Sequence, residues 1–288
     1  MRARADVKYG RPQFRTTVWP GMVIPPPKLR SIADVEIVDD WILWPVQDPR
    51  RPATAELPTD FYLRELMDLQ CDDLEAIKDL ISKFGSFSSY KLEDLDGEAT
   101  HLADSTQIEL PDDDYYENGY HRSNLTVHLE EAQRAIETWI ASQIEHGLED
   151  LVEEYATEDA LYEAQSALPE YQTMSDLRNH LIDERVEHMG ATLNAALKIF
   201  SAGIGELSER QPTIYAVSFL QMYNHLTEQA TLRRCANEPC SNVFVRQRDR
   251  ADHGQNRTTG VIYCSHGCAR AQAQRQLRRR RKANAAIA

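Results

Sequence analysis

The 288-residue sequence predicts a mainly α-helical fold. An acidic helical body with a short N-terminal β element precedes a small C-terminal module that contains four of the five cysteines. Apolar residues recur every three or four positions through the middle of the chain, as they do on the buried face of a helix. The formal charge falls into three blocks, +6 over residues 1–30, −30 over 31–230 and +10 over 231–288. We therefore expect three regions: an arm over 1–33, a body over 34–232 and a module over 233–288.

The first region is predicted to be an extended basic arm. It contains Pro12, Pro20 and the triplet Pro25–Pro27, and proline fixes the backbone and removes an amide donor. The arm could dock on the acidic body, contact nucleic acid or stay disordered, and the sequence leaves these three alternatives open.

A short β element is predicted where the body begins. Between Val35 and Trp44 many residues are β-branched or aromatic, as is typical of strands. Asp39 and Asp40 interrupt this run at the position of a turn. The pattern indicates one or two short strands.

Helices are predicted for most of the remaining body. The first runs from Asp60 to Phe84, where Gly85 ends it. Residues 86–125 are rich in polar residues and predict an irregular loop that could include short strands. Three more helical series follow: one from Leu129 to Tyr155, one from an N-cap at Ser175 to Phe200, and one over 213–232 after Pro212.

Four cysteines near the C-terminus form two closely spaced pairs. Four residues separate Cys235 from Cys240, three separate Cys264 from Cys268, and 23 residues lie between the pairs. This spacing is the pattern of a tetrahedral zinc site, so these cysteines are the predicted ligands of Zn²⁺. Two disulfides, or four unrelated core thiols, are the alternatives. The odd number of cysteines and an expected intracellular location disfavour disulfides.

The residues around these cysteines predict a small zinc fold. Val243–Val245 and Gly260–Tyr263 are β-prone segments that could pair as a hairpin, and the residues after Cys264 favour a helix. A zinc knuckle, a hairpin and a helix that carries the last two ligands describe a treble-clef fold. His253 and His266 are expected to be spectators, because four thiolates already complete the site.

The module resembles the CGNR-type zinc fingers of bacteria. The resemblance rests on CANEPC at 235–240, NVFVRQ at 242–247, YCS at 263–265 and the basic helix after Cys268, and it covers about a fifth of the chain. It implies a C-terminal treble-clef module attached to a larger N-terminal domain, in a transcription regulator. The sequence departs from the family in that Ala269–Ala271 replaces Gly-Asn-Arg, and in that the last cysteine pair is one residue closer.

The last helix and the loop before it are strongly basic. Clustered arginines suit the phosphate backbone of DNA, and glutamine amides on a groove-bound helix can pair with adenine. RNA is an alternative partner, and a solvated helix end or pairing with the acidic body would also explain the charge. The predicted nucleic-acid contacts are Arg246, Arg248, Arg250, Arg257, Arg270, Gln272, Gln274, Arg275, Arg278, Arg279, Arg280, Arg281 and Lys282.

No catalytic site is predicted. His180, Glu184 and His188 follow one another at four-residue spacing, which an exposed charged helix face explains better than a metal or acid/base site. Glycine-rich nucleotide motifs and GxSxG are absent from the sequence. Four thiolates would also leave zinc no open position for chemistry.

These observations predict a zinc-stabilised, cytoplasmic DNA-binding protein that is not an enzyme. We expect a bacterial-type transcription regulator that forms a homodimer through its helical body. No apolar stretch reaches the length of a membrane span. The alternative is a protein-interaction or adaptor factor whose zinc module is purely structural.

Overall fold

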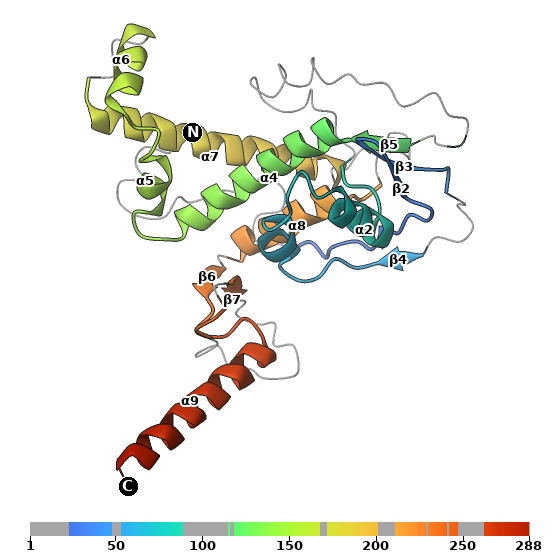
Figure 1. Cartoon of the computed structure of the whole chain (residues 1–288). Coiled ribbons are helices and arrows are strands. Elements are labelled where there is room, and N and C mark those ends of the chain that lie inside the picture. The colour runs from blue at the N-terminus through green and yellow to red at the C-terminus, as the bar shows by residue number, and fades with distance from the viewer. Residues whose placement is uncertain are drawn as a thin grey trace. The chain divides into compact units, whose positions relative to one another are not determined.

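The structure is mainly helical with small β-sheets, as the sequence predicts (Figure 1). The chain divides into two compact units, Met1–Asn224 and His225–Ala288. Most of the predicted arm, residues 1–22, lies outside the described part of the chain. The structure is a computed structural model that describes residues 23–47, 53–88, 115, 118–167, 172–200, 211–228, 230–240, 242–246 and 262–287.

Short strands precede the long helices in the first unit, and two more strands lie between α8 and α9. The strands are β1 Leu29–Arg30, β2 Glu36–Val38, β3 Trp41–Trp44, β4 Thr54–Ala55, β5 Asn118–His121, β6 Thr231–Arg234 and β7 Val243–Arg246. The helices are η1 Tyr62–Leu66, α2 Leu74–Phe84, α4 Arg122–Ser142, α5 Gly147–Val152, α6 Glu158–Ala167, α7 Met174–Leu197, η3 Lys198–Phe200, α8 Ile214–Thr227 and α9 His266–Ile287.

A three-stranded antiparallel sheet, ordered β2-β3-β5, forms where the β element is predicted. In the β2–β3 hairpin Val38 pairs with Trp41, and Asp39 has a left-handed backbone with φ of +52°. Aspartate tolerates this conformation better than most residues, so the chain turns here as predicted. β5 pairs with the other edge of β3 and places Tyr120 opposite Ile42. This strand lies within the segment for which an irregular loop is predicted.

The predicted helix between Asp60 and Phe84 is interrupted. η1 is a short π-helix, and turns separate it from α2. α2 ends at Gly85 as predicted, where φ is +99° and the amide donates to the carbonyl of Ile81 at 2.7 Å. A Cβ atom at Gly85 would lie 2.0 Å from the carbonyl oxygen of Arg30, so glycine is needed here for both conformation and space.

α4 and α7 are long helices of the first unit that pack side by side (Figure 1). α4 begins at Arg122, before the predicted start at Leu129. The sequence predicts a single apolar stripe here, but the helix breaks near His146, whose φ is +59°. Gly147 follows at a close approach, where a Cβ atom would lie 2.4 Å from the carbonyl oxygen of Ala141. α5 begins at this point and packs against both long helices.

α7 begins after Thr173, which is its N-cap in place of the predicted Ser175. The Thr173 hydroxyl accepts from the amide of Asp176 at 3.2 Å, and the Asp176 carboxylate accepts from the amide of Thr173 at 2.9 Å. Serine and threonine are both good caps, and the acid three residues after Thr173 completes this capping box. α6 lies in a segment for which the sequence analysis predicts no helix.

The core of the first unit includes α8, which is apolar over most of its surface and almost entirely buried. Tyr215 and Phe219 on this helix are among the largest fully buried side chains. Several of its buried polar side chains have partners, among them Ser218, Gln221 and Asn224. The side chain of Gln221 accepts from the amide of Phe61 at 3.1 Å and donates to the carbonyl of Pro58 at 2.9 Å. These bonds satisfy a polar side chain in an apolar core.

The helical series predicted over 213–232 is shorter than expected. α8 ends at Thr227, and Thr231–Arg234 forms β6 because it pairs with β7. Among the described residues no helix has both the length and the apolar composition needed to cross a membrane.

Candidate metal centre

The first cysteine pair lies on the loop between β6 and β7. We call residues 235–240 the knuckle loop. Backbone hydrogen bonds fold this loop tightly: the amide of Cys235 donates to the carbonyl of Asn242 at 3.0 Å, and the amide of Cys240 donates to that of Asn237 at 2.7 Å. The antiparallel pairing of β6 with β7 holds the two ends of the loop together. Both sulfurs of the pair are thereby positioned by local structure.

The second cysteine pair lies at the start of α9. Cys264 precedes the helix and Cys268 is in its first turn. The amide of Ala236 in the knuckle loop donates to the carbonyl of Ile262 at 2.8 Å, which ties the chain just before Cys264 to the first pair. The hydroxyl of Ser265 accepts from the amide of Cys268 at 3.2 Å, as an N-cap does.

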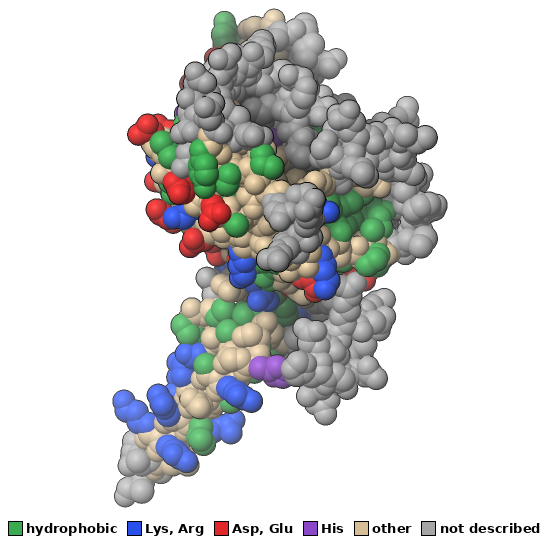
Figure 2. Space-filling model, turned by 90° about the vertical axis from the view of Figure 1, so that its right-hand side faces the viewer, with side chains coloured by type: hydrophobic (Ala, Val, Ile, Leu, Met, Phe, Trp, Pro, Cys, Tyr) green, Lys and Arg blue, Asp and Glu red, His purple; other side chains and the backbone are tan. Residues whose placement is uncertain are grey.

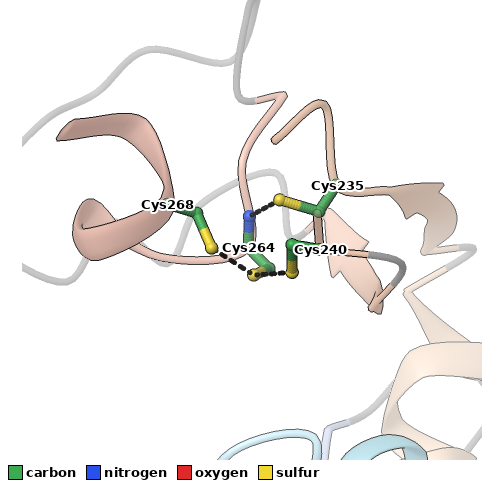
Figure 3. Close-up of side chains that lie close together, drawn as sticks. All are labelled: Cys235, Cys240, Cys264 and Cys268. Atoms are coloured by element: carbon green, nitrogen blue, oxygen red, sulfur yellow. Dashed lines mark hydrogen bonds between the residues drawn. The ribbon is translucent and has the colours of Figure 1, made fainter. Parts of the chain in front are cut away.

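The four sulfur atoms point toward one another (Figure 3), and all lie within 4.8 Å of one another. The Sγ atom of Cys264 is 3.7 Å from that of Cys240 and 3.5 Å from that of Cys268, and the amide of Cys264 donates to the Sγ atom of Cys235 at 3.4 Å. None of the four is in a disulfide, which would need a sulfur separation of about 2.05 Å. The group could hold a metal ion. It is the only such group of three or more ligating side chains among the described residues.

The thiols of this cluster differ in how readily they ionise. Hydrogen bonds from the Ser265 hydroxyl and the Cys264 thiol lower the pKa of Cys268 to about 7. Burial and the neighbouring thiols raise the pKa of Cys264 to about 12. Thiolates at this spacing repel one another, so all four ionise together only around a cation.

One face of α9 is attached to the knuckle loop. The carboxylate of Glu238 accepts from two guanidinium nitrogens of Arg279 at 2.6 and 2.5 Å, and from the side-chain nitrogen of Gln272 at 3.1 Å. Arg275 donates to the side-chain oxygen of Asn237. Gln272 and Asn237 are buried although they are polar. These bonds orient the helix that carries the last cysteine.

The predicted nucleic-acid contacts fall into three groups. Three loop arginines lie outside the described residues, Arg248, Arg250 and Arg257, and only the backbone of Arg246 is described. Three residues of α9 bond to the knuckle loop or to each other: Gln272, Arg275 and Arg279. The rest are exposed along α9 and form no ion pair with any described residue: Arg270, Gln274, Arg278, Arg280, Arg281 and Lys282.

Strand pairing in the module includes a strand that the sequence does not predict. β7 forms where a strand is expected, and β6 pairs with it. Ile262 and Tyr263 are not in a strand, and residues 260–261 lie outside the described residues. β6 and β7 are joined by the short knuckle loop, so little chain entropy is lost when they pair.

His188 is not on an exposed charged face as expected. Its Nε2 atom lies 2.8 Å from Oε2 of Glu131 on α4, and 18% and 17% of the two side chains are exposed. His180 pairs with Glu184 within α7 at 3.1 Å. The three residues therefore do not form one exposed stripe, because His188 bonds to the neighbouring helix.

Sequence reasoning missed three residues that support the cysteines: Asn237, Glu238 and Ser265. A charge signal was available for one of them. Residues 231–288 contain 13 basic residues but only three acidic ones, and Glu238 lies between the two cysteines of the first pair. An isolated acid near a basic helix indicates an ion pair.

Two histidines were expected to be spectators of the metal site. His266 is exposed and outside the sulfur cluster, and His253 lies outside the described residues.

Comparisons with models of protein families, with curated proteins and with solved structures find no match to this chain.

Proposed function

We propose that the four cysteines hold one Zn²⁺ ion, and that the module which this ion stabilises binds the phosphate backbone of DNA through α9. The observation that carries the proposal is the gathering of four thiols at the start of an arginine-rich helix. Zinc bonded to sulfur at about 2.3 Å in a tetrahedron would separate the sulfurs by about 3.8 Å. The separations of 3.5 and 3.7 Å are close to that value.

The proposed zinc has a structural role. Few apolar side chains are buried in the described part of the module after β6, with Phe244 and Val245 the largest of them. A core this small needs a further constraint, which a metal supplies. The knuckle loop, β7 and a helix bearing the last ligand support a treble-clef arrangement. Four thiolates complete the coordination of zinc, so we propose no catalytic function for this site.

The charge of α9 supports the DNA-binding part of the proposal. Between His266 and Ile287 the helix contains seven Lys and Arg residues and no Asp or Glu. Figure 2 shows Lys and Arg side chains along the side of this helix that faces the viewer. Each phosphate that such a side chain neutralises releases a counterion, so binding should weaken steeply as salt is added. A transcription regulator, as the CGNR resemblance implies, is the role that we propose.

Two measurements on the whole 288-residue chain test the proposal. Elemental analysis should find one zinc per chain. Fluorescence anisotropy with a labelled random-sequence duplex should show that log affinity falls linearly with log salt, with a slope of about −0.9 for each phosphate contacted.

Paired arginine variants locate the binding surface. The double variant Arg278→Gln, Arg281→Gln should give a shallower salt slope, which corresponds to the loss of about two phosphate contacts. Its zinc content should be unchanged. Arg178→Gln combined with Arg185→Gln, which removes equal charge from α7, is the matched control and should leave the slope unchanged. No duplex binding at low salt would contradict the proposal and favour a protein-interaction function.

A further inference from the structure

α9 has two faces with different environments. Gln272, Arg275 and Arg279 are on the face that bonds to the knuckle loop. The opposite face is exposed, and we call it the outer face. Its members are Arg270, Gln274, Leu277 and Arg281.

Helix geometry places these four residues together. Successive residues advance by about 100° around an α-helix, so the four lie within about 60° of one another and Arg279 lies almost opposite their midline. Arg278 is about 70° to one side of that midline, and Arg280 is about 90° to the other. Along the axis of the outer face, Gln274 and Leu277 thus lie between Arg270 and Arg281, with Arg278 and Arg280 on its two sides.

Leu277 is the apolar member of the outer face. It is 49% exposed, and the residues that follow it along the helix, Arg278–Arg281, are all arginines. One leucine is too small an apolar surface for the core of a protein interface. A single apolar side chain among hydrogen-bonding ones does suit the major groove, where the thymine methyl group is an apolar feature.

Resting on the proposed function, we infer that the outer face of α9 enters the major groove of duplex DNA, where Gln274 and Leu277 read bases. The Gln274 amide can bond to both N6 and N7 of adenine, and Leu277 can contact a thymine methyl group. Arg278 and Arg280 face the phosphates of the two strands that border the groove. A helix of about 10–12 Å diameter fits a major groove about 12 Å wide.

The environment of the other glutamines assigns base reading to Gln274. Gln272 is buried, and its side chain bonds to Glu238 and Arg275. Gln276 is exposed but lies about 160° around the helix from Gln274, away from the outer face. Duplex RNA is not the target that this face fits, because side chains cannot read its deep and narrow major groove.

The test selects a preferred sequence from a randomised duplex library with the full-length, zinc-loaded protein. Affinities for the selected duplex and for a random duplex are then measured for three variants. Gln274→Ala and Leu277→Ala should each lower the ratio of the two affinities by roughly 5- to 100-fold, with affinity for the random duplex unchanged. Gln276→Ala is the matched control and should keep the ratio. Unchanged zinc content and circular dichroism verify that each variant is folded.

Three outcomes would overturn the inference, and they are distinguishable. The first is binding of random duplex with no sequence selected, and the second is that Gln276→Ala lowers the ratio as much as Gln274→Ala. In either case base reading by the outer face is wrong, while backbone binding stands. If no duplex is bound at all, both the inference and the proposed function fail.

Discussion

Glu238 and Arg279 form a doubly hydrogen-bonded ion pair that joins the knuckle loop to α9 across 41 residues of sequence. Planar guanidinium and carboxylate groups match in this geometry, so the pair fixes the rotation of the helix as well as its position. Arg279 and Gln272 hold the pKa of the Glu238 carboxyl below its usual value. Under the proposed function, an arginine engaged with Glu238 has less capacity to bind phosphate.

Glu238→Gln should therefore have two opposite effects. The thermal midpoint of the second unit should fall, because the charged pair is lost. Affinity for random duplex DNA should rise, with a salt slope steeper by about one phosphate, since Arg279 is released. Because the folded-state pKa of Glu238 is lowered, the pair stabilises the parent at neutral pH and is lost as pH falls through that pKa. Glu228→Gln, at an exposed acid of the same unit, should leave midpoint and slope unchanged; an equal effect there would contradict a specific role for Glu238.

Cys264→Ser should abolish stoichiometric zinc binding and unfold the second unit. The α-helical circular dichroism of the first unit should remain, because its core does not depend on the metal. Cys71→Ser provides the control, because Cys71 lies outside the cluster. This variant should still bind one zinc per chain. Elemental analysis and far-ultraviolet circular dichroism measure both effects. Full zinc occupancy in Cys264→Ser would show that the cluster is not the ligand set.

Gly85→Ala and Gly190→Ala should change stability in opposite directions. Gly85 has a positive φ, and a Cβ atom there would lie 2.0 Å from the carbonyl oxygen of Arg30, so alanine should destabilise the first unit by about 1–3 kcal/mol. At Gly190 in α7 a Cβ atom would meet no heavy atom of the described residues within 4 Å, apart from the backbone of its own helix. Alanine there should stabilise by roughly 0.5–1 kcal/mol. Urea unfolding, monitored by circular dichroism, measures the change in the free energy of unfolding for each variant. Destabilisation by both variants would contradict the prediction for Gly190.

His128 should make the first unit sensitive to acid. It is buried in α4 beside the ring of Tyr215, and burial, partly offset by Glu131, lowers its pKa to about 4. In the unfolded chain the imidazole of this histidine takes up a proton near pH 6.5, whereas in the folded chain it does so only near pH 4. The free energy of unfolding should therefore be unaffected by this group above pH 6.5 and should fall between pH 6.5 and pH 4, by at most about 1.4 kcal/mol per pH unit.

Comparison of two histidine variants isolates this effect. His128→Asn should flatten the pH dependence of the unfolding free energy between pH 6.5 and pH 4. His146→Asn alters an exposed histidine in a left-handed conformation that asparagine tolerates, and it should keep the pH dependence of the parent. Identical pH profiles for the parent and His128→Asn would show that His128 is not the sensitive group.

Much of the candidate site could be predicted because its signals are local. The cysteine spacing identified the four residues whose sulfurs gather, and the runs of Ala, Gln and Arg indicated the helix after them. The β-prone residues around Asp39 and Asp40 likewise predicted the β2–β3 hairpin. These features depend on neighbours within a few residues, which the sequence shows directly.

Other predictions were wrong where partners far apart in sequence decide the structure. His188 was expected on an exposed face, but it lies against Glu131, because α4 and α7 pack side by side. The helix predicted over 213–232 was expected to include Thr231 and Leu232, but these residues belong to β6, because the short knuckle loop brings β7 beside them. Periodicity also could not distinguish one continuous helix from two helices interrupted at His146.

The sequence by itself determined the helical character of the body, the basic charge of α9 and the identity of the clustered cysteines, because composition, periodicity and spacing act over short distances along the chain. Tertiary structure alone decided which side chains of α9 are available to a partner. That choice depends on the rotation of the helix against the knuckle loop. Side chains of α9 set this rotation by donating hydrogen bonds to Glu238 and Asn237, more than 30 residues away in sequence.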